Sequence, residues 1–390
     1  MGNSPQMPKL VYVVTEDWYF VSHRLALAKA AQAAGYKVSV ITRVNRHAAP
    51  IHDAGIALYP ISFDRSGMNP FSEIGTIAKL TRLYRKIEPD LVHHVAMKPS
   101  LYGSWAARRA GVPAVVNALM GLGYVFSSEE KRARRLRPIV RTAFKTAMRH
   151  SNSRVIVQNT DDAALLQNQG LATESIIRMI VGSGINLEQF PFSLEPAGRT
   201  RVVLPARLLR DKGVLEFIDA ARRLKAEGSL AEFVLAGAPD SSNPTSVTEA
   251  MIAGWVSEGL VTYLRWSEDM LSVLSDATIV CLPSYREGLP KVLLEAAACG
   301  RAIVTTDVPG CREIIWNGVN GWVVAPRSGA ALADGLREAI AKPSLRLIYA
   351  RAGRKTVEEH YSHETINRQT IGVYGEIVER AHDPKVRGFT

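Results

Sequence analysis

Short apolar runs alternate with helical segments along the first half of the chain. The segment HRLALAKAAQAAG (23–35) has helical spacing, closes on Gly35 and lies between two of these runs. Runs that stay apolar throughout indicate strands buried on both faces. Such strands, separated by amphipathic helices, predict a parallel sheet covered by helices on both sides. The predicted strands are LVYVVT (10–15), KVSVITR (37–43), DLVHHV (90–95), AVVNAL (114–119) and RVIVQN (154–159).

The same pattern starts again near residue 201, after a segment with two prolines and a glycine, FPFSLEPAG (190–198). At 390 residues the chain exceeds one ordinary core, so two domains are expected. We predict an α/β fold of two Rossmann-like, doubly wound domains that face a cleft, where ligands bind beyond the carboxyl ends of the strands. The second set comprises a helix over 212–228 and strands at 201–208, 231–237, 261–266, 278–283, 301–306 and 321–326.

Composition limits the class of protein and its partners. With 47% hydrophobic and 22% charged residues, the chain reads as a soluble globular protein without leader or membrane span. Three cysteines without metal-ligand spacing favour a cytosolic, disulfide-free protein. Residues 1–195 carry 24 Lys and Arg against 14 Asp and Glu, whereas the remainder carries 24 against 23. The first half is therefore expected to meet something anionic.

The stretch REGLPKVLLEAAACG is predicted to join a strand to a helix at the carboxyl edge of the second sheet. Pro290 suits the start of that helix and Gly300 its end. Free N–H groups of the helix start and of the loop at Gly288 and Leu289 would form a cradle for phosphate or sugar oxygens. Glu287 lies in the loop and Glu295 on the helix. The two carboxylates would hold different parts of one elongated ligand, and they suit a metal pair poorly.

A second candidate segment, ARLLRDKGV (206–214), carries Arg207 and Lys212 between a strand and a helix. Cations near a helix start oppose the helix dipole, which argues against a purely structural role. Two fixed cations can offset the charge of a departing diphosphate, a task that other enzymes give to a divalent ion. No Asp-x-Asp motif occurs in the chain. No metal site is predicted.

These segments together resemble the donor-binding signature of the retaining family 4 glycosyltransferases of GT-B fold. The resemblance rests on EGLP, on the frame CG-AIVTTD-PG--E and on NG-NGWVV, which follow one another in order. It implies that Glu287 lies beside the donor sugar, that Glu295 holds the ribose, and that Arg207 and Lys212 grip the diphosphate. Trp266 would support the base or be a core aromatic residue.

Gly237 would let a ligand approach the backbone or simply form a turn. The GT-B resemblance also divides the chain into parts. We expect an N-terminal acceptor-binding domain (1–190), a linker (191–200), a nucleotide-sugar-binding domain (201–362) and a last helix (363–390). In this fold the last helix commonly returns to the first domain, where it would act in hinge motion.

The first half looks like the branch that acts on undecaprenyl-diphosphate glycans. This resemblance rests on EDW-F-SHR, on HHVAMKPSLYGSWAARRAGVP (93–113) and on VVNALMGLGYVF (115–126). It departs from many members at Val95 and Met120, where a histidine is often found. The residues expected to meet the acceptor are His94, Lys98, Gly121, Gly123 and Tyr124. A structural role for the histidine and an ordinary surface role for the lysine stay open.

Residues 131–150 carry eight Lys or Arg and no acid, with apolar residues at helical spacing (Leu136, Val140, Phe144, Ala147 and Met148). A basic amphipathic helix suits an anionic membrane surface, with its apolar stripe near the acyl chains. The open alternative is a stripe that packs into the core beneath a solvated basic face. Nucleic acid is not expected, because aromatic residues for base stacking are missing.

The resemblance as a whole implies a retaining, metal-independent glycosyltransferase. It would move a sugar, an N-acetylhexosamine, from a UDP-sugar to a polyprenyl-diphosphate glycan at the cytoplasmic face of the plasma membrane. No cofactor besides the nucleotide-sugar donor is expected, and a GDP-sugar donor stays open. The alternatives are a non-catalytic partner that binds nucleotide sugars and a UDP-sugar epimerase of the same broad fold.

Overall fold

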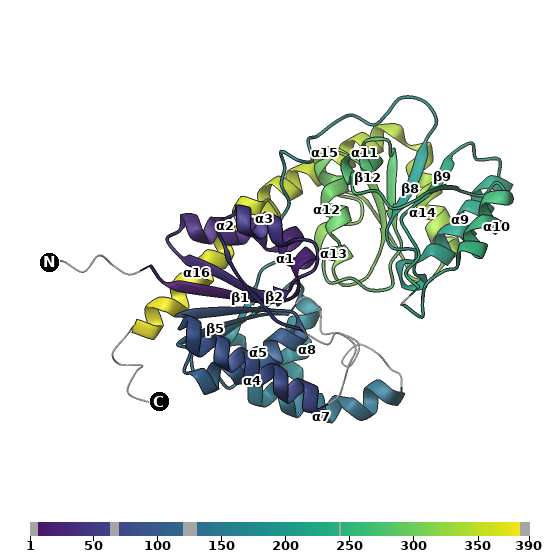
Figure 1. Ribbon diagram of the computed structural model, residues 1–390. Coiled ribbons are helices and arrows are strands. Elements are labelled where there is room, and N and C mark those ends of the chain that lie inside the picture. Colours follow the sequence, from purple (N-terminus) through teal and green to yellow (C-terminus); the bar gives the residue numbers. More distant parts are fainter. Residues whose placement is uncertain (1–6, 63–69, 120–130, 242, 383–390) are drawn as a thin grey trace. The chain divides into compact units, whose positions relative to one another are not determined.

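Two units make up the computed structural model, which describes residues 7–62, 70–119, 131–241 and 243–382 (Figure 1). The first unit comprises residues 1–184 and 363–390, and the second comprises residues 185–362. The boundary between the two units therefore lies between residues 184 and 185, whereas the sequence predicts that the first domain ends at residue 190. Ile185 pairs with Ser362, and the buried Phe190 accepts a 2.9 Å hydrogen bond on its carbonyl from Arg354. These contacts hold residues 185–190 in the second unit.

Among the described residues of the first unit, seven strands form one parallel sheet in the order β3-β2-β1-β4-β5-β6-β7. β3 and β7 were not predicted. They are edge strands of four and three residues that stay partly exposed, so neither shows a continuous apolar run. The strands are β1 (Lys9–Glu16), β2 (Lys37–Arg43), β3 (Ala57–Pro60), β4 (Leu91–Val95), β5 (Ala114–Leu119), β6 (Ser153–Val157) and β7 (Ile177–Met179).

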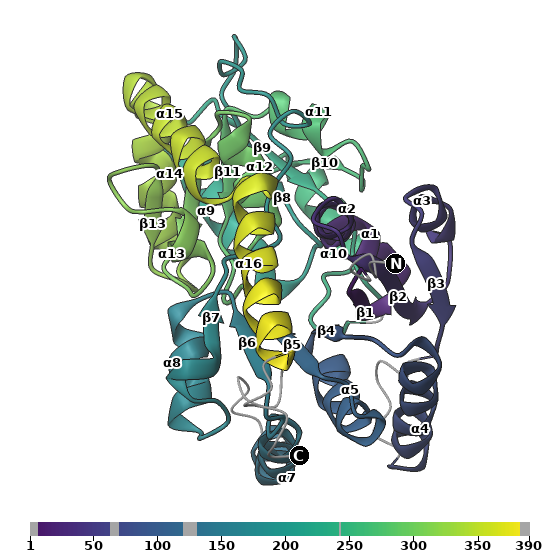
Figure 2. The same cartoon turned by 90° about the vertical axis from the view of Figure 1, so that its left-hand side faces the viewer.

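Helices cover both faces of this sheet. α1, α2, α3 and α16 share one apolar core with the sheet, and α4, α5, α7 and α8 cover the other face (Figure 1). α16 packs on α2, β5 and β6 although it comes last in the chain (Figure 2). The helices are α1 (Asp17–His23), α2 (Leu25–Ala33), α3 (Ala48–Asp53), α4 (Pro70–Ile87), α5 (Met97–Ala110), α7 (Lys131–Ala147), α8 (Thr160–Asn168) and α16 (His363–His382).

The second unit repeats the design. Its six strands, as far as the chain is described, form a parallel sheet in the order β10-β9-β8-β11-β12-β13. They are β8 (Arg201–Pro205), β9 (Glu232–Ala236), β10 (Thr262–Leu264), β11 (Ile279–Leu282), β12 (Ala302–Thr306) and β13 (Trp322–Val324). The helices are α9 (Val214–Ala226), α10 (Glu249–Ser257), α11 (Met270–Ser275), α12 (Lys291–Ala298), α13 (Cys311–Ile314), α14 (Gly329–Ala341) and α15 (Pro343–His360).

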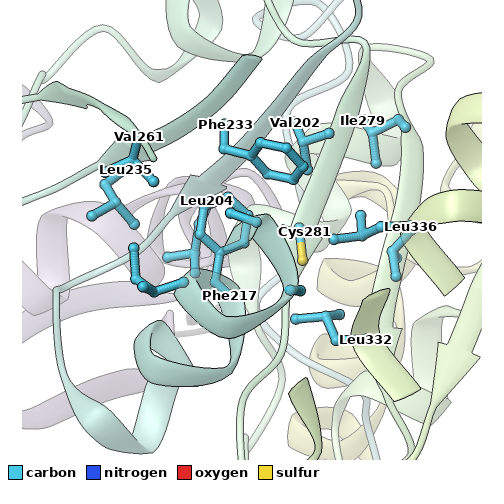
Figure 3. Close-up of a cluster of buried hydrophobic side chains, with 14 of the residues drawn as sticks. Val202, Leu204, Phe217, Phe233, Leu235, Val261, Ile279, Cys281, Leu332 and Leu336 are labelled. Carbon is cyan, nitrogen blue, oxygen red and sulfur yellow. The ribbon is translucent and has the colours of Figure 1, made fainter. Parts of the chain in front are cut away.

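The main core of the second unit lies between its sheet and the helices α9 and α14 (Figure 3). Phe217 of α9 meets Phe233 of β9 edge to face, with ring centroids 5.8 Å apart. Cys281 of β11 is buried in the same core, and Cys299 and Cys311 are also buried and free. The core fixes the strands, and the loops at their carboxyl ends are thereby placed side by side.

In the part of the chain that the structure describes, no helix is both long and apolar enough to cross a membrane.

Candidate functional site

The candidate residues of the second unit lie in loops that follow its strands. The strand order reverses between β8 and β11, and ligands of doubly wound sheets bind where the order reverses. The loop after β8 carries Arg207 and Lys212, and the loop after β11 carries Glu287. Residues far apart in the sequence are therefore brought together at the carboxyl edge of the sheet.

Glu287 and Lys212 form the centre of this site. The Lys212 ammonium donates a hydrogen bond to Oε1 of Glu287 and forms an ion pair with it. The hydroxyl of Ser284 donates to the same oxygen at 2.6 Å. Only 11% of the Glu287 side chain and 22% of the Lys212 side chain are exposed. A charged pair held by a third donor and largely removed from water has a defined orientation.

Two glycines let the neighbouring loops come close. Gly213, directly after Lys212, has a φ of +75°, and a Cβ there would lie 2.1 Å from the carbonyl oxygen of Pro283. Gly310 has a φ of +84°, and a Cβ there would lie 2.5 Å from the carbonyl oxygen of Gly288. Any side chain at either position would push the loops apart. Both glycines therefore support the position of Glu287.

The loop after β8 is also tied to its neighbours by backbone hydrogen bonds. Arg210 N–H donates to Thr245 O at 2.8 Å, and Tyr285 N–H donates to Asp211 O at 2.9 Å. The loop of Lys212 is thus held by the segments that follow β9 and β11. Such support keeps a charged side chain in one geometry.

Arg207 lies at the same edge but more openly. Its Nη1 is 3.0 Å from Oδ2 of Asp240, and 57% of its side chain is exposed. Gly237, after β9, has a φ of +158°, and a Cβ there would lie 1.9 Å from Ala206 O. The backbone at Ala206 therefore already occupies the space beside Gly237. This contact explains why a glycine is needed there, and no ligand is required to explain it.

Glu295 is buried on α12, and its carboxylate lies 3.6 Å from the ammonium of Lys291, one helical turn before it. Burial raises the pKa of Glu295, and the ion pair with Lys291 opposes this only in part. Gly288 and Leu289 are partly exposed and join Glu287 to this helix. The helix begins at Lys291 with Pro290 as its N-cap, one residue later than predicted.

Trp266 follows β10 and is 57% exposed, which excludes the alternative of a core aromatic residue. An exposed tryptophan can stack on a planar group.

Sequence reasoning missed a further set of residues beside Glu287. The hydroxyl of Tyr285 donates to Oε1 of Glu216 at 2.6 Å, and the Arg327 guanidinium lies 4.8 Å from the centre of the Tyr285 ring. Burial, together with the nearby Glu216 carboxylate, raises the pKa of Tyr285 to about 12. Thr306 donates to the Ser284 carbonyl at 2.5 Å. The position of Ser284 and Tyr285 directly before the EGLP motif could have pointed to them. Glu216 and Arg327 are distant in sequence and belong to no motif, so no sequence signal could have found them.

The acceptor residues predicted in the first unit have different fates. His94 is wholly buried, with Nε2 2.9 Å from the hydroxyl of Tyr84 and Nδ1 2.8 Å from Oδ1 of Asn117. Burial lowers its pKa to about 4. The prediction that His94 meets an acceptor is therefore wrong, because both ring nitrogens are used inside the core. Lys98 pairs with Glu73 at 3.1 Å. The remaining three, Gly121, Gly123 and Tyr124, lie outside the described residues.

The basic helix α7 packs its apolar stripe inward, so the prediction that this stripe meets the membrane is wrong where the structure describes it. Phe144, Ala147 and Met148 are buried against β6 and α8, and Val140 packs against the same cluster. The side chain of Leu136 lies outside the part of the chain that the structure describes. Arg141 lies on the exposed side and donates to Gln169 O at 3.0 Å. Among the described side chains of α7, the exposed ones are Pro138, Arg141, Thr142 and Lys145.

The family described as "Glycosyl transferases group 1" matches residues 199–342, and the family described as "Glycosyl transferase 4-like" matches residues 9–159. A relative from Campylobacter jejuni, N,N'-diacetylbacillosaminyl-diphospho-undecaprenol alpha-1,3-N-acetylgalactosaminyltransferase, is 27% identical over 369 residues. The match covers 91% of this chain and 95% of that protein. Both family matches describe glycosyltransferases rather than epimerases.

Solved structures show the same fold. Sucrose-phosphate synthase from Thermosynechococcus elongatus superposes with a TM-score of 0.78 at 21% identity, covering 96% of this chain and all of that chain. Anabaena Alr3699/HepE in complex with UDP and glucose has a TM-score of 0.75 at 18% identity, covering 95% of this chain and all of that chain. The predicted GT-B fold of two Rossmann-like domains is thereby confirmed.

Proposed function

This chain belongs to the glycosyltransferases, with a group 1 domain after a 4-like domain, and on that premise we propose its donor, acceptor and mechanism. The proposed reaction moves an N-acetylhexosamine from a UDP-sugar to a polyprenyl-diphosphate glycan. The anomeric configuration is retained, and no metal takes part. The single observation that carries the proposal is the shielded Lys212–Glu287 pair with Ser284 as its third member.

The cations of the site suit a nucleotide diphosphate. Lys212 and Arg207 follow the same strand and would offset the negative charge that develops on the departing diphosphate. Fixed cations need no reorganisation during the reaction, and in a site removed from water they act more strongly than in solution. This is the role that makes a divalent ion unnecessary in the proposed mechanism.

The carboxylates would bind the rest of the donor. Glu287, largely enclosed beside Gly288 and Leu289, would accept hydrogen bonds from the sugar hydroxyls. Glu295 would hold the ribose hydroxyls, and Trp266 would support the base. UDP as the nucleotide is supported by the Anabaena protein, whose structures contain UDP and glucose or UDP-glucose.

Retention follows from attack on the same face that the diphosphate leaves. The acceptor oxygen forms a bond to the anomeric carbon while the bond from that carbon to the phosphate oxygen breaks. The hydroxyl proton passes to the departing phosphate oxygen. The protein's contribution is to orient the reactants and to stabilise charge.

The acceptor proposal is supported by the Campylobacter jejuni relative, whose name describes transfer to a diphospho-undecaprenol glycan. A chain that uses such an acceptor would work at the cytoplasmic face of the plasma membrane as a peripheral protein. The basic residues on the exposed sides of α4 and α7 would favour an anionic surface by electrostatic attraction.

The proposal is tested by measuring sugar transfer to a farnesyl-diphosphate-linked N-acetylglucosamine in the presence of EDTA, with UDP- and GDP-sugars compared. We expect turnover with a UDP-N-acetylhexosamine. Lys212→Ala and Glu287→Gln should each lower kcat by roughly 10²–10³-fold, the usual loss when one charge-stabilising group is removed. Lys355→Ala, at a 73% exposed position of the same unit, is the control and should leave kcat unchanged.

Full activity in both site variants would contradict the assignment of the site. Activity that disappears with EDTA and returns with a divalent ion would contradict metal independence. If UDP raises the melting temperature but no donor is hydrolysed or transferred, the chain is a non-catalytic nucleotide-sugar-binding partner instead.

A further inference from the structure

A cavity of about 480 Å³ lies at the carboxyl end of β2 and β3 in the first unit. Its lining combines the last residue of β2 and the segment after β3 with one side of α4. The lining residues are Arg43, Val44, Pro60, Ile61, Ser62, Lys79, Arg82 and Leu83. The volume falls in the range of small-molecule sites, and the carboxyl edge of a parallel sheet is where such sites usually lie.

The described lining is strongly cationic. It contains Arg43, Lys79 and Arg82 and no carboxylate. Glu16, at the end of β1, lies 3.5 Å from Arg43 and also accepts a 3.0 Å hydrogen bond from Asn45. This pair orients Arg43 and offsets one of the three charges. Lys79 and Arg82 form no ion pair among the described residues, so a net positive charge remains.

Three positive charges on α4 are spaced so that they repel one another within the helix. Lys79, Arg82 and Lys86 follow one another at spacings of three and four residues, and all are exposed. Like charges at these spacings repel each other, which lowers helix stability. A bound anion would remove this repulsion for the two residues that line the cavity. Val44, Pro60 and Leu83 would contact an apolar or sugar portion next to the anion.

From these observations we propose that the cavity binds a phosphate or diphosphate group through Arg43, Lys79 and Arg82, with the Ser62 hydroxyl as a further donor. The cavity belongs to the first unit, whereas the donor residues all belong to the second unit. It lies on the same sheet edge as the segment after β4 that carries Lys98, about 10 Å along the edge from it, since β2 and β4 are two strand spacings apart. An elongated anionic ligand can span that distance.

The ligand group has two possible sources, the diphosphate of the acceptor or a phospholipid headgroup. Assignment to the acceptor rests on the proposed function, whereas the anion site itself does not. The first experiment therefore uses inorganic pyrophosphate and the full-length chain, with hydrogen exchange read by mass spectrometry. Pyrophosphate should slow exchange in peptides covering 43–62 and 76–84. Slower exchange in peptides covering 207–213 and 284–290 would report pyrophosphate binding at the second unit, and it is measured separately.

The variant Lys79→Gln/Arg82→Gln should raise the Kd for protection at the cavity at least tenfold and leave the second-unit peptides unchanged. Lys29→Gln/Lys86→Gln removes the same charge from exposed positions of the same unit that do not line the cavity, and it should change this Kd less than twofold. Absence of protection at the cavity in the unmodified chain would overturn the proposal. An equal loss in both double variants would overturn it too, because general charge would then account for binding.

Two further measurements identify the source. If the acceptor supplies the diphosphate, the cavity variant raises the KM for farnesyl-diphosphate-linked N-acetylglucosamine at least tenfold and leaves the KM for the UDP-sugar unchanged. If a headgroup supplies the phosphate, binding to phosphatidylglycerol vesicles falls tenfold and the acceptor KM stays constant. Failure of sugar transfer with any acceptor would refute the proposed function, while the pyrophosphate result would still decide the anion site.

Discussion

At the scale of single residues, the buried carboxylate of Glu295 lowers the stability of the folded chain at neutral pH. Its carboxylate is buried on α12, and burial raises its pKa in the folded chain. The unfolded chain therefore loses this proton at lower pH than the folded chain does. As pH rises from the ordinary value of the group through the raised one, the free energy of unfolding falls. At neutral pH the chain keeps a carboxylate where a neutral group would be more stable, as is common at binding sites.

We expect Glu295→Gln to raise the melting temperature of the second unit at pH 7.5, because the amide avoids the cost of a buried charge. Each kcal/mol gained corresponds to about 2–4 °C for a unit of this size. The gain should shrink toward pH 4, where the glutamate is mostly protonated in both states. Nucleotide binding should weaken at the same time. The measurements are thermal unfolding between pH 4 and 8 and a titration with UDP.

Glu338→Gln is the control for that experiment. The pKa of this exposed carboxylate on α14 is lowered, chiefly by its hydrogen bond to Lys342. Its removal should not stabilise the chain at neutral pH. An equal rise in melting temperature for both variants would show that burial of Glu295 is not the cause.

At the scale of elements, the short turn between β8 and α9 positions Lys212. Gly213 ends that turn in the left-handed region and leaves room for the carbonyl of Pro283. Gly228 has a similar φ of +86°, but a Cβ there would meet nothing within 4 Å. A substitution at Gly228 would therefore cause backbone strain alone, whereas one at Gly213 would cause backbone strain and a steric clash.

Gly213→Ala should therefore lower stability more than Gly228→Ala does, and it alone should lower kcat. Both variants place a side chain at positive φ, which costs roughly 1–2 kcal/mol. Only the first displaces the loop that carries Lys212. Urea unfolding and steady-state kinetics of the two variants provide the comparison. Equal losses of stability with unchanged kcat in both would contradict this role of the loop.

Helix α7 gives a second prediction at this scale. Phe144 is 2% exposed and packs among β6 and α8, so Phe144→Ala leaves a cavity and should cost about 3–5 kcal/mol of unfolding free energy. Lys145→Ala, at the exposed neighbouring position, should cost less than 0.5 kcal/mol. Chemical denaturation of both variants tests this. If Phe144→Ala has little effect on the free energy of unfolding, the apolar stripe of α7 is not packed in the core and is again a candidate for membrane contact.

At the scale of the whole molecule, the chain builds its first unit from both of its ends. α16 contributes Ile366, Val373, Tyr374 and Ile377 to the core that also contains β1 and α2. The hydroxyl of Tyr374 lies 3.0 Å from that of Tyr12 and 2.5 Å from Nδ1 of His93. The last helix is therefore a core element, and its removal would affect folding of the first unit before it affected any hinge motion.

Tyr374→Ala should destabilise the first unit by about 3–5 kcal/mol and leave the second unit unchanged. Calorimetry should then show one transition at lower temperature and one at its original position. Arg368→Ala, on the exposed side of the same helix, should shift neither. A single transition that shifts as a whole would mean that the two units unfold as one.

The sequence by itself determined the alternation of buried strands with helices, the two doubly wound domains and the neighbourhood of Glu287, but not the short edge strands β3 and β7. Buried parallel strands need continuous apolar runs, and the motif around Glu287 is local in sequence. Only the tertiary structure decided which side chains meet. The partner of Lys212 is 75 residues away, His94 is held by side chains of α4 and β5, and the stripe of α7 has its partners in β6 and α8. Such contacts depend on the packing of distant segments, which periodicity and spacing do not encode.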